Sequence, residues 1–116
     1  MGFSQGEIIW INFKFTDGTG EKTRPALVIS NTALEFMDEV ILLKITSVNR
    51  KDGFDFPLLP SMLQGGQLPF ADSVIRIGSV QSTSTLIIDQ KRPKLKIKKE
   101  YLQQIVDRFL EQIEVE

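Results

Sequence analysis

Two apolar segments joined by a polar loop constrain this chain most. Residues 6–13 read GEIIWINF and residues 25–30 read PALVIS, with a loop rich in Gly, Thr and Asp between them. Large apolar and β-branched runs of this length predict strands, and the Asp-Gly and Thr-Gly dipeptides of the loop predict turns. We therefore expect a strand over residues 7–15, a loop over 16–23 and a second strand over 25–30.

The loop ends on Arg24, and Pro25 follows directly. The proline ring disfavours a helical conformation of the preceding residue, so Arg24 should be extended. We expect Pro25 at the start of a central strand, where no ladder donor is needed, and Arg24 as its first residue. A permanently charged, planar guanidinium held there suits a phosphate. The alternative is a surface arginine paired with Glu21 or Asp17.

The rest of the chain alternates short apolar runs with turn-forming residues, which is typical of a mainly β protein. Gly78 predicts a kink in a strand that begins at residue 73. The Asn-Thr pair at residues 31–32, followed by residues 33–37, predicts a short capped helical turn. Residues 60–69 predict a loop, and residues 85–88 fit either a helical or an extended piece. Further strands are predicted over residues 40–47, 54–59, 73–77 and 94–98.

The clearest element is the last one. Seven large side chains recur with helical spacing: Tyr101, Leu102, Ile105, Val106, Phe109, Leu110 and Ile113. This spacing predicts an amphipathic helix of about four turns. The helix lacks a good N-cap, so its stability must come from docking. Five or more short strands with one terminal helix predict a single domain, over residues 1–116, folded as a small SH3-like twisted barrel.

The residue types that are absent exclude several kinds of site. The 116 residues include no cysteine and no histidine. Disulfides, thiolate or histidine metal sites, a Ser-His-Asp triad and a two-histidine ribonuclease mechanism are therefore ruled out. The net charge of -1 argues against coating nucleic acid by charge alone, although a local basic groove remains possible. No apolar run is long enough to span a membrane, and the N-terminus carries no secretory signal, so we expect a cytoplasmic protein.

The blocks at residues 6–13 and 24–31, GEIIWINF and RPALVISN, resemble the opening of the MazF/PemK-like toxins of bacterial toxin–antitoxin pairs. A second block of that family, a strand that ends in hydroxyl residues, resembles VILLKITS at residues 40–47. The order and spacing of the blocks fit, and the resemblance extends more weakly to the C-terminal helix. It implies a CcdB/MazF-like fold.

The resemblance also implies an activity, the cleavage of single-stranded RNA without a metal or another cofactor. The 2'-hydroxyl attacks the adjacent phosphate and leaves a cyclic phosphate and a 5'-hydroxyl. The family's catalytic arginine falls on Arg24 and its catalytic hydroxyl on Thr46. A fixed guanidinium can donate two charge-assisted hydrogen bonds to the phosphorane-like dianion. The alternative role of Thr46 is a strand-end threonine that satisfies backbone groups. The group that removes the 2'-hydroxyl proton stays open between Arg24, Glu21 and Asp17.

RNA contacts are expected from three places. These are the loop over residues 16–23, the polar stretch directly after Thr46, and the region of residue 81. In the third place the family often has Asp-Gln followed by an apolar and then a basic residue, whereas valine and serine flank the glutamine here. The supporting residues are Thr16, Lys22, Ser47, Asn49, Arg50, Lys51 and Gln81.

Two further features have alternative roles. Trp10, Phe13 and Phe15 could stack on bases, although we favour core packing for Trp10 and Phe13. Six basic residues lie between residues 91 and 99 with no acidic residue among them. They could bind phosphates, but we favour outward lysines that protect an edge strand from aggregation.

Partners also follow from the resemblance. We expect a symmetric homodimer in which edge strands and the third-strand region make the contact. We also expect an antitoxin whose disordered segment folds onto the dimer and covers the RNA groove. Two other function classes stay open. One is a gyrase-directed toxin of the same superfamily, which relies on a terminal aromatic, whereas this chain ends in Glu-Val-Glu. The other is a non-catalytic small-barrel binding module, or a member that has lost activity.

Overall fold

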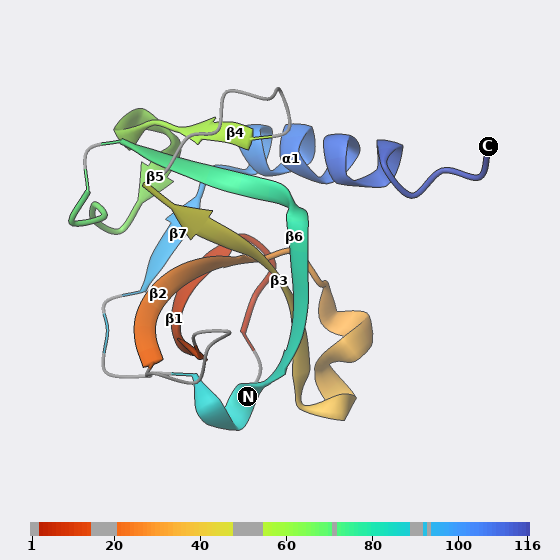
Figure 1. Ribbon diagram of the computed structural model, residues 1–116, viewed down its shortest axis with the longest axis horizontal. Helices are drawn as coiled ribbons and strands as arrows, with labels where there is room; N and C mark the ends of the chain where they lie inside the picture. The colour runs from red at the N-terminus through yellow and green to blue at the C-terminus, as the bar shows by residue number, and fades with distance from the viewer. Residues whose placement is uncertain (1–2, 15–20, 48–54, 71, 89–91, 93) are drawn as a thin grey trace.

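A curled antiparallel sheet with one α-helix along its side forms the described part of the molecule (Figure 1). The computed structural model describes residues 3–14, 21–47, 55–70, 72–88, 92 and 94–116. The strands are β1 (Glu7–Lys14), β2 (Glu21–Val28), β3 (Glu39–Thr46), β4 (Asp55–Leu58), β5 (Leu63–Gln64), β6 (Ser73–Ser84) and β7 (Leu95–Ile97). The helices are the 3₁₀ turns η1 (Thr32–Met37), η2 (Pro60–Met62) and η3 (Thr85–Ile87), and α1 (Lys99–Glu111).

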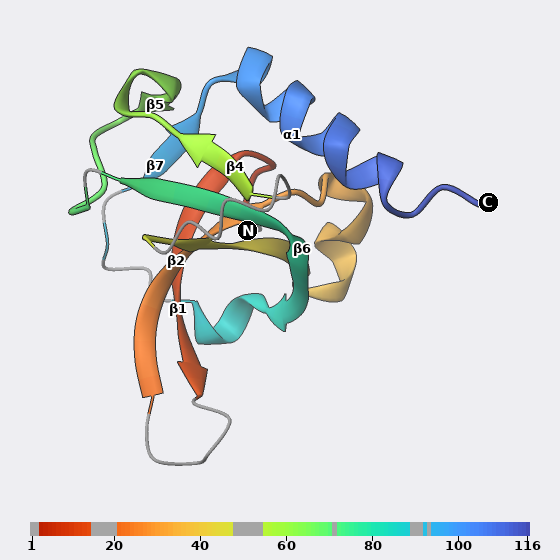
Figure 2. The ribbon, with the colours of Figure 1, turned by 45° about the horizontal axis from the view of Figure 1, so that its top comes forward.

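The strands follow the order β4-β6-β3-β2-β1-β7-β5, and each described ladder is antiparallel. The first two strands pair over their whole lengths, from Ile8 opposite Leu27 to Lys14 opposite Glu21. Figure 2 shows that the ends of β1 and β2 far from the helix extend away from the rest of the sheet. The mainly β, twisted-barrel prediction with a C-terminal helix is thus confirmed, as a half-barrel of seven strands.

Side chains alternate along each strand, so the sheet has two faces with different neighbours. We call the face that packs against α1 the first face; its buried residues include Leu27, Leu43, Ile45, Ile75, Leu102 and Ile105. We call the opposite one the second face; its buried residues include Ile9, Ile11, Ala26, Leu42 and Ile88. The near-continuous apolar runs of β1 and β3 reflect this burial on both sides.

Strand β6 bends sharply in its middle (Figure 1). Leu43 lies opposite Val80, but the next residue of β3, Lys44, lies opposite Arg76. Residues 77–79 are therefore inserted into β6 relative to β3, as a large bulge. Gln112, just after α1, donates a hydrogen bond from its Nε2 to the backbone oxygen of Ile77 at 2.6 Å. The predicted kink at Gly78 is confirmed.

The expected start of the second strand was wrong. Strand β2 begins at Glu21, so Arg24 and Pro25 lie inside it, opposite Ile11 and Trp10. Pro25 is tolerated there because the described ladder to β3 begins only at Ala26, so the missing N–H removes no bond from that ladder. The cap of η1 is confirmed, since the Oδ1 of Asn31 accepts a hydrogen bond from the Ala33 nitrogen at 2.9 Å.

The ends of the other elements also differ from the expectations. Residues 60–69 are not all loop, because they include η2 and β5. The period-two pattern of β7 is confirmed, but β7 lies between β1 and β5 and is therefore not an edge strand. Helix α1 starts without a side-chain cap, as expected. Leu110 and Ile113 do not join its buried face, being 49% and 60% exposed, because the end of the helix runs past the sheet (Figure 1). No helix in the described residues is long and apolar enough to cross a membrane.

Candidate active site

The two sequence-predicted catalytic residues lie on neighbouring strands. In the ladder between β2 and β3, Ala26 lies opposite Lys44 and Val28 lies opposite Leu42. The ladder ends at the Ala26–Lys44 pair, and Arg24 and Thr46 each lie two residues beyond it on their own strand. Both residues belong to the second face, because each is two residues along its strand from a member of the Ala26–Lys44 pair.

Burial differs between these two residues. Arg24 is half-buried, whereas Thr46, at the end of β3, is 5% exposed. A partly desolvated guanidinium interacts more strongly with an anion than one in bulk water does. Ser47, the next residue, is exposed.

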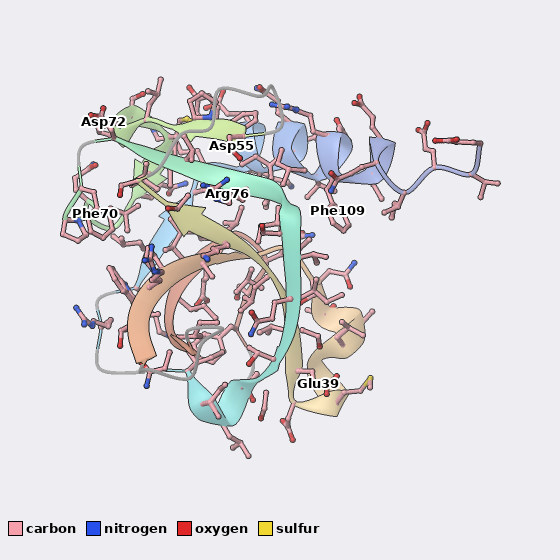
Figure 3. The ribbon with its side chains drawn as sticks, in the orientation of Figure 1. Glu39, Asp55, Phe70, Asp72, Arg76 and Phe109 are labelled. Atoms are coloured by element: carbon pink, nitrogen blue, oxygen red, sulfur yellow. The ribbon has the colours of Figure 1, made fainter. Side chains whose placement is uncertain are left out.

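A cavity of about 310 Å³ begins beside Ser47 and runs between β4 and the start of β6. Ser73 and Asp72 line it from the β6 side, with Asp72 near the top of the view in Figure 3. Ser73 is 5% exposed, and among the described residues its Oγ is a buried hydroxyl without a hydrogen-bond partner. Sequence reasoning missed Ser73. Its only signal was a polar pair, Asp-Ser, directly before an apolar strand.

A group of charged side chains lies on the second face, together with Arg24 and Thr46. Lys44 lies opposite Arg76 of β6, and Arg76 lies opposite Asp55 of β4. An Nη1 of Arg76 and an Oδ2 of Asp55 are 3.5 Å apart, and these side chains are only 9% and 6% exposed. Figure 3 shows the two side by side where β4 meets β6. Sequence reasoning missed this pair too, because 21 residues of chain separate its members and only the strand register brings them together.

The predicted supporting residues are placed less completely. Gln81, on β6, is exposed and lies opposite Leu42 of β3. It lines a cavity of about 300 Å³ together with Lys44 and Ser79. Lys22 lies in β2, opposite Phe13. Thr16, Asn49, Arg50 and Lys51 lie outside the described residues.

Two other sequence interpretations can be compared with the structure. Trp10 is 7% exposed, so the preference for core packing is confirmed, and the guanidinium carbon of Arg92 lies 4.7 Å from its ring centroid. Of the candidate proton acceptors, Glu21 lies in β2 opposite Lys14, and Asp17 lies outside the described residues. Within the described residues, no group of three or more acidic side chains lies close enough to hold a metal ion.

A family model described as the PemK-like, MazF-like toxin of type II toxin–antitoxin systems matches residues 4–113. The chain belongs to this toxin family. The match covers almost all of the chain and includes the Arg24 and Thr46 blocks on which the resemblance was based. No curated protein sequence matches this MazF-like chain closely enough to count as a relative.

Solved structures of MazF toxins share the fold. A crystal structure of MazE-MazF from Deinococcus radiodurans is similar with a TM-score of 0.74 and 16% identity, over 97% of both chains. An endoribonuclease from a mycobacterial species has a TM-score of 0.69 and 12% identity, over 97% of this chain and 90% of that one. An endoribonuclease in complex with its cognate antitoxin, also mycobacterial, has a TM-score of 0.68 and 13% identity, over 99% and 100%. At these identities the likeness shows the MazF fold.

Proposed function

We propose that this MazF-like chain is an endoribonuclease that cleaves single-stranded RNA, with Arg24 and Thr46 at its centre. The observation that supports the proposal is that Arg24 and Thr46 share one face of two neighbouring strands, each two residues beyond the Ala26–Lys44 pair. The mycobacterial proteins with this fold are endoribonucleases, which supports the same activity.

In the proposed reaction the 2'-oxygen forms a bond to the adjacent phosphorus, and the bond from phosphorus to the 5'-oxygen breaks. The 2'-hydroxyl loses its proton, and the leaving 5'-oxygen gains one. Arg24 donates two hydrogen bonds to the non-bridging oxygens, whose charge grows in the transition state. Thr46 donates to a non-bridging oxygen or orients the leaving group.

The proposed protein partners are an antitoxin and a second copy of the chain. The antitoxin follows from the toxin family and from the solved toxin–antitoxin complexes with this fold. A homodimer is supported by exposed apolar side chains in η3. Leu86 and Ile87 are 86% and 60% exposed, and an isologous contact would cover them.

The activity is tested with a long single-stranded RNA incubated with the protein in EDTA. We expect fragments that end in a cyclic phosphate and begin with a 5'-hydroxyl. A matched oligonucleotide that carries a single 2'-deoxy sugar at a mapped cleavage site should resist cleavage at that bond alone. Intact RNA would contradict the proposal and favour a gyrase-directed or purely binding protein.

The dimer is tested by light scattering at micromolar concentration. We expect a mass close to twice the 13.2 kDa of one chain, and a lower mass for Leu86→Glu, which places a charge in the exposed apolar group. A wild-type mass near 13.2 kDa would contradict the dimer.

A further inference from the structure

A row of charged side chains crosses the second face beside Arg24 and Thr46. Lys44 lies opposite Arg76, and Arg76 lies opposite Asp55, so all three share one face. Lys44 precedes Thr46 by two residues on β3, a distance of about 6.8 Å along a strand. Lys44 is therefore the next residue on this face of β3 after Thr46, and Arg76 and Asp55 continue the row onto β6 and β4.

The row is costly as a packing arrangement. Like charges directly opposite one another on neighbouring strands are destabilising, and Lys44 and Arg76 are such a pair. Asp55 pairs with Arg76, but a buried ion pair is weak evidence for stability, because apolar residues of similar size often do as well. Elsewhere on this face apolar residues such as Ile9 and Leu42 fill the equivalent positions.

The charges have a simple explanation in an anionic ligand. Together with Arg24, the row places three cationic side chains and one carboxylate on one face of a chain whose net charge is -1. A phosphate bound on this face would be attracted by the positive charges of Arg24 and Lys44. The side chains of Arg76 and Asp55 are almost fully buried, so their charges act through protein rather than through bulk water. Screening is weaker in protein than in water.

The row also adjoins a cavity. Lys44, Leu42, Ser79, Val80 and Gln81 line a space of about 300 Å³ on the side of Lys44 away from Thr46. The bulge of residues 77–79 allows β6 to contribute to this space, because it shifts the register there. A cavity of this size is at the lower end of the range that small ligands occupy.

We propose that Lys44 binds the RNA phosphate that flanks the cleaved one, and that the adjoining cavity receives the nucleotide beyond it. Asp55 pairs with Arg76 and holds it beside Lys44. This inference deepens the proposed ribonuclease function and rests on it for the identity of the ligand. It assigns Lys44 to substrate binding and leaves the chemistry to Arg24 and Thr46.

The test is the salt dependence of RNA binding, followed by fluorescence anisotropy. The probe is a single-stranded 2'-O-methyl oligonucleotide, which lacks the attacking hydroxyl. Lys44→Gln should weaken binding roughly tenfold and lower the slope of log K against log salt by about 0.7, the value for one phosphate contact on a single strand. Lys44→Arg should keep the slope. Lys96→Gln is the matched control, since it removes the same charge from an exposed position on β7.

The outcomes separate this inference from the proposed activity. Binding that depends on Lys44 in a protein that leaves unmodified RNA intact would support the site and overturn the activity. An unchanged slope for Lys44→Gln, or an equal loss for Lys96→Gln, would overturn the site even if the wild type cleaves RNA. Weaker binding of polyglutamate with no change for RNA would also overturn it, since the row would then recognise acidic peptide.

A neutral linkage locates the phosphate. One methylphosphonate next to the cleaved bond should weaken binding to the wild type and have no further effect on Lys44→Gln. Equal losses for both proteins at each flanking linkage would overturn the assignment to a flanking phosphate. Urea unfolding curves of each variant confirm that it is folded before binding is compared.

Discussion

Breaking the buried ion pair between Asp55 and Arg76 should cost far more than breaking a surface pair. The closest nitrogen and oxygen are 3.5 Å apart, a separation at which two unit charges attract by about 5 kcal/mol at an effective dielectric constant of about 20. Removing one partner leaves a buried charge without its counter-ion, so Asp55→Leu and Arg76→Met should each lower the free energy of unfolding by about 3–5 kcal/mol. A surface pair would lose at most about 1 kcal/mol.

The double variant gives the sharper result. Asp55→Leu with Arg76→Met removes both charges, so it should be more stable than either single variant, with a coupling energy of about 3 kcal/mol. The assay is urea unfolding, followed by the fluorescence of Trp10, the single tryptophan and 7% exposed. Lys96→Gln should change the free energy by less than about 0.5 kcal/mol. Single variants that each cost under about 1 kcal/mol and add together would refute this reasoning.

Three further changes have expected outcomes in the same unfolding assay. Gly65→Ala should cost about 1–3 kcal/mol, because Gly65 has φ +86° and a Cβ there would lie 2.6 Å from the Lys94 backbone oxygen. Gly78→Ala, whose Cβ would meet its nearest atom at 4.0 Å, is the matched control and should cost much less. Ser73→Ala should stabilise the protein by about 1 kcal/mol, since it removes a buried hydroxyl without a partner. A clear loss of stability would show that this hydroxyl makes a hydrogen bond. Ile105→Ala should cost about 2–5 kcal/mol, because Ile105 is fully buried. Ile113, by contrast, is 60% exposed, so Ile113→Ala should cost under about 0.5 kcal/mol. Similar losses for the two variants would contradict the conclusion that the helix stops packing against the sheet before Ile113.

Much of the fold followed from local patterns. The apolar runs of β1 and β3 and the helical spacing that begins at Tyr101 are properties of short windows, so the sequence shows them directly. The position of Pro25 was misjudged because its tolerance depends on where the ladder to β3 begins, which no local pattern contains. Strand β5, with two residues, is too short to have a period.

The candidate site also contains residues that local sequence patterns indicate and residues that only the strand pairing brings together. Arg24 and Thr46 were predicted from the family blocks, and the structure adds that they belong to neighbouring strands on one face. Lys44, Asp55 and Arg76 gave no local signal, because a lone charge in an apolar strand is ordinary until its opposite residue is known. The bulge in β6 decides that Arg76, rather than a residue three positions later, lies opposite Lys44.

Cleavage of one RNA in EDTA by the wild type, Arg24→Ala and Arg108→Ala tests the proposed centre most directly. Arg108 is a matched arginine on α1, with its guanidinium carbon 5.7 Å from the Phe56 ring centroid and on the helix side of the sheet. Losing Arg24 should lower the cleavage rate by roughly 10²–10³-fold, while Arg108→Ala should keep most of the wild-type rate. Equal cleavage by the wild type and Arg24→Ala would contradict the account.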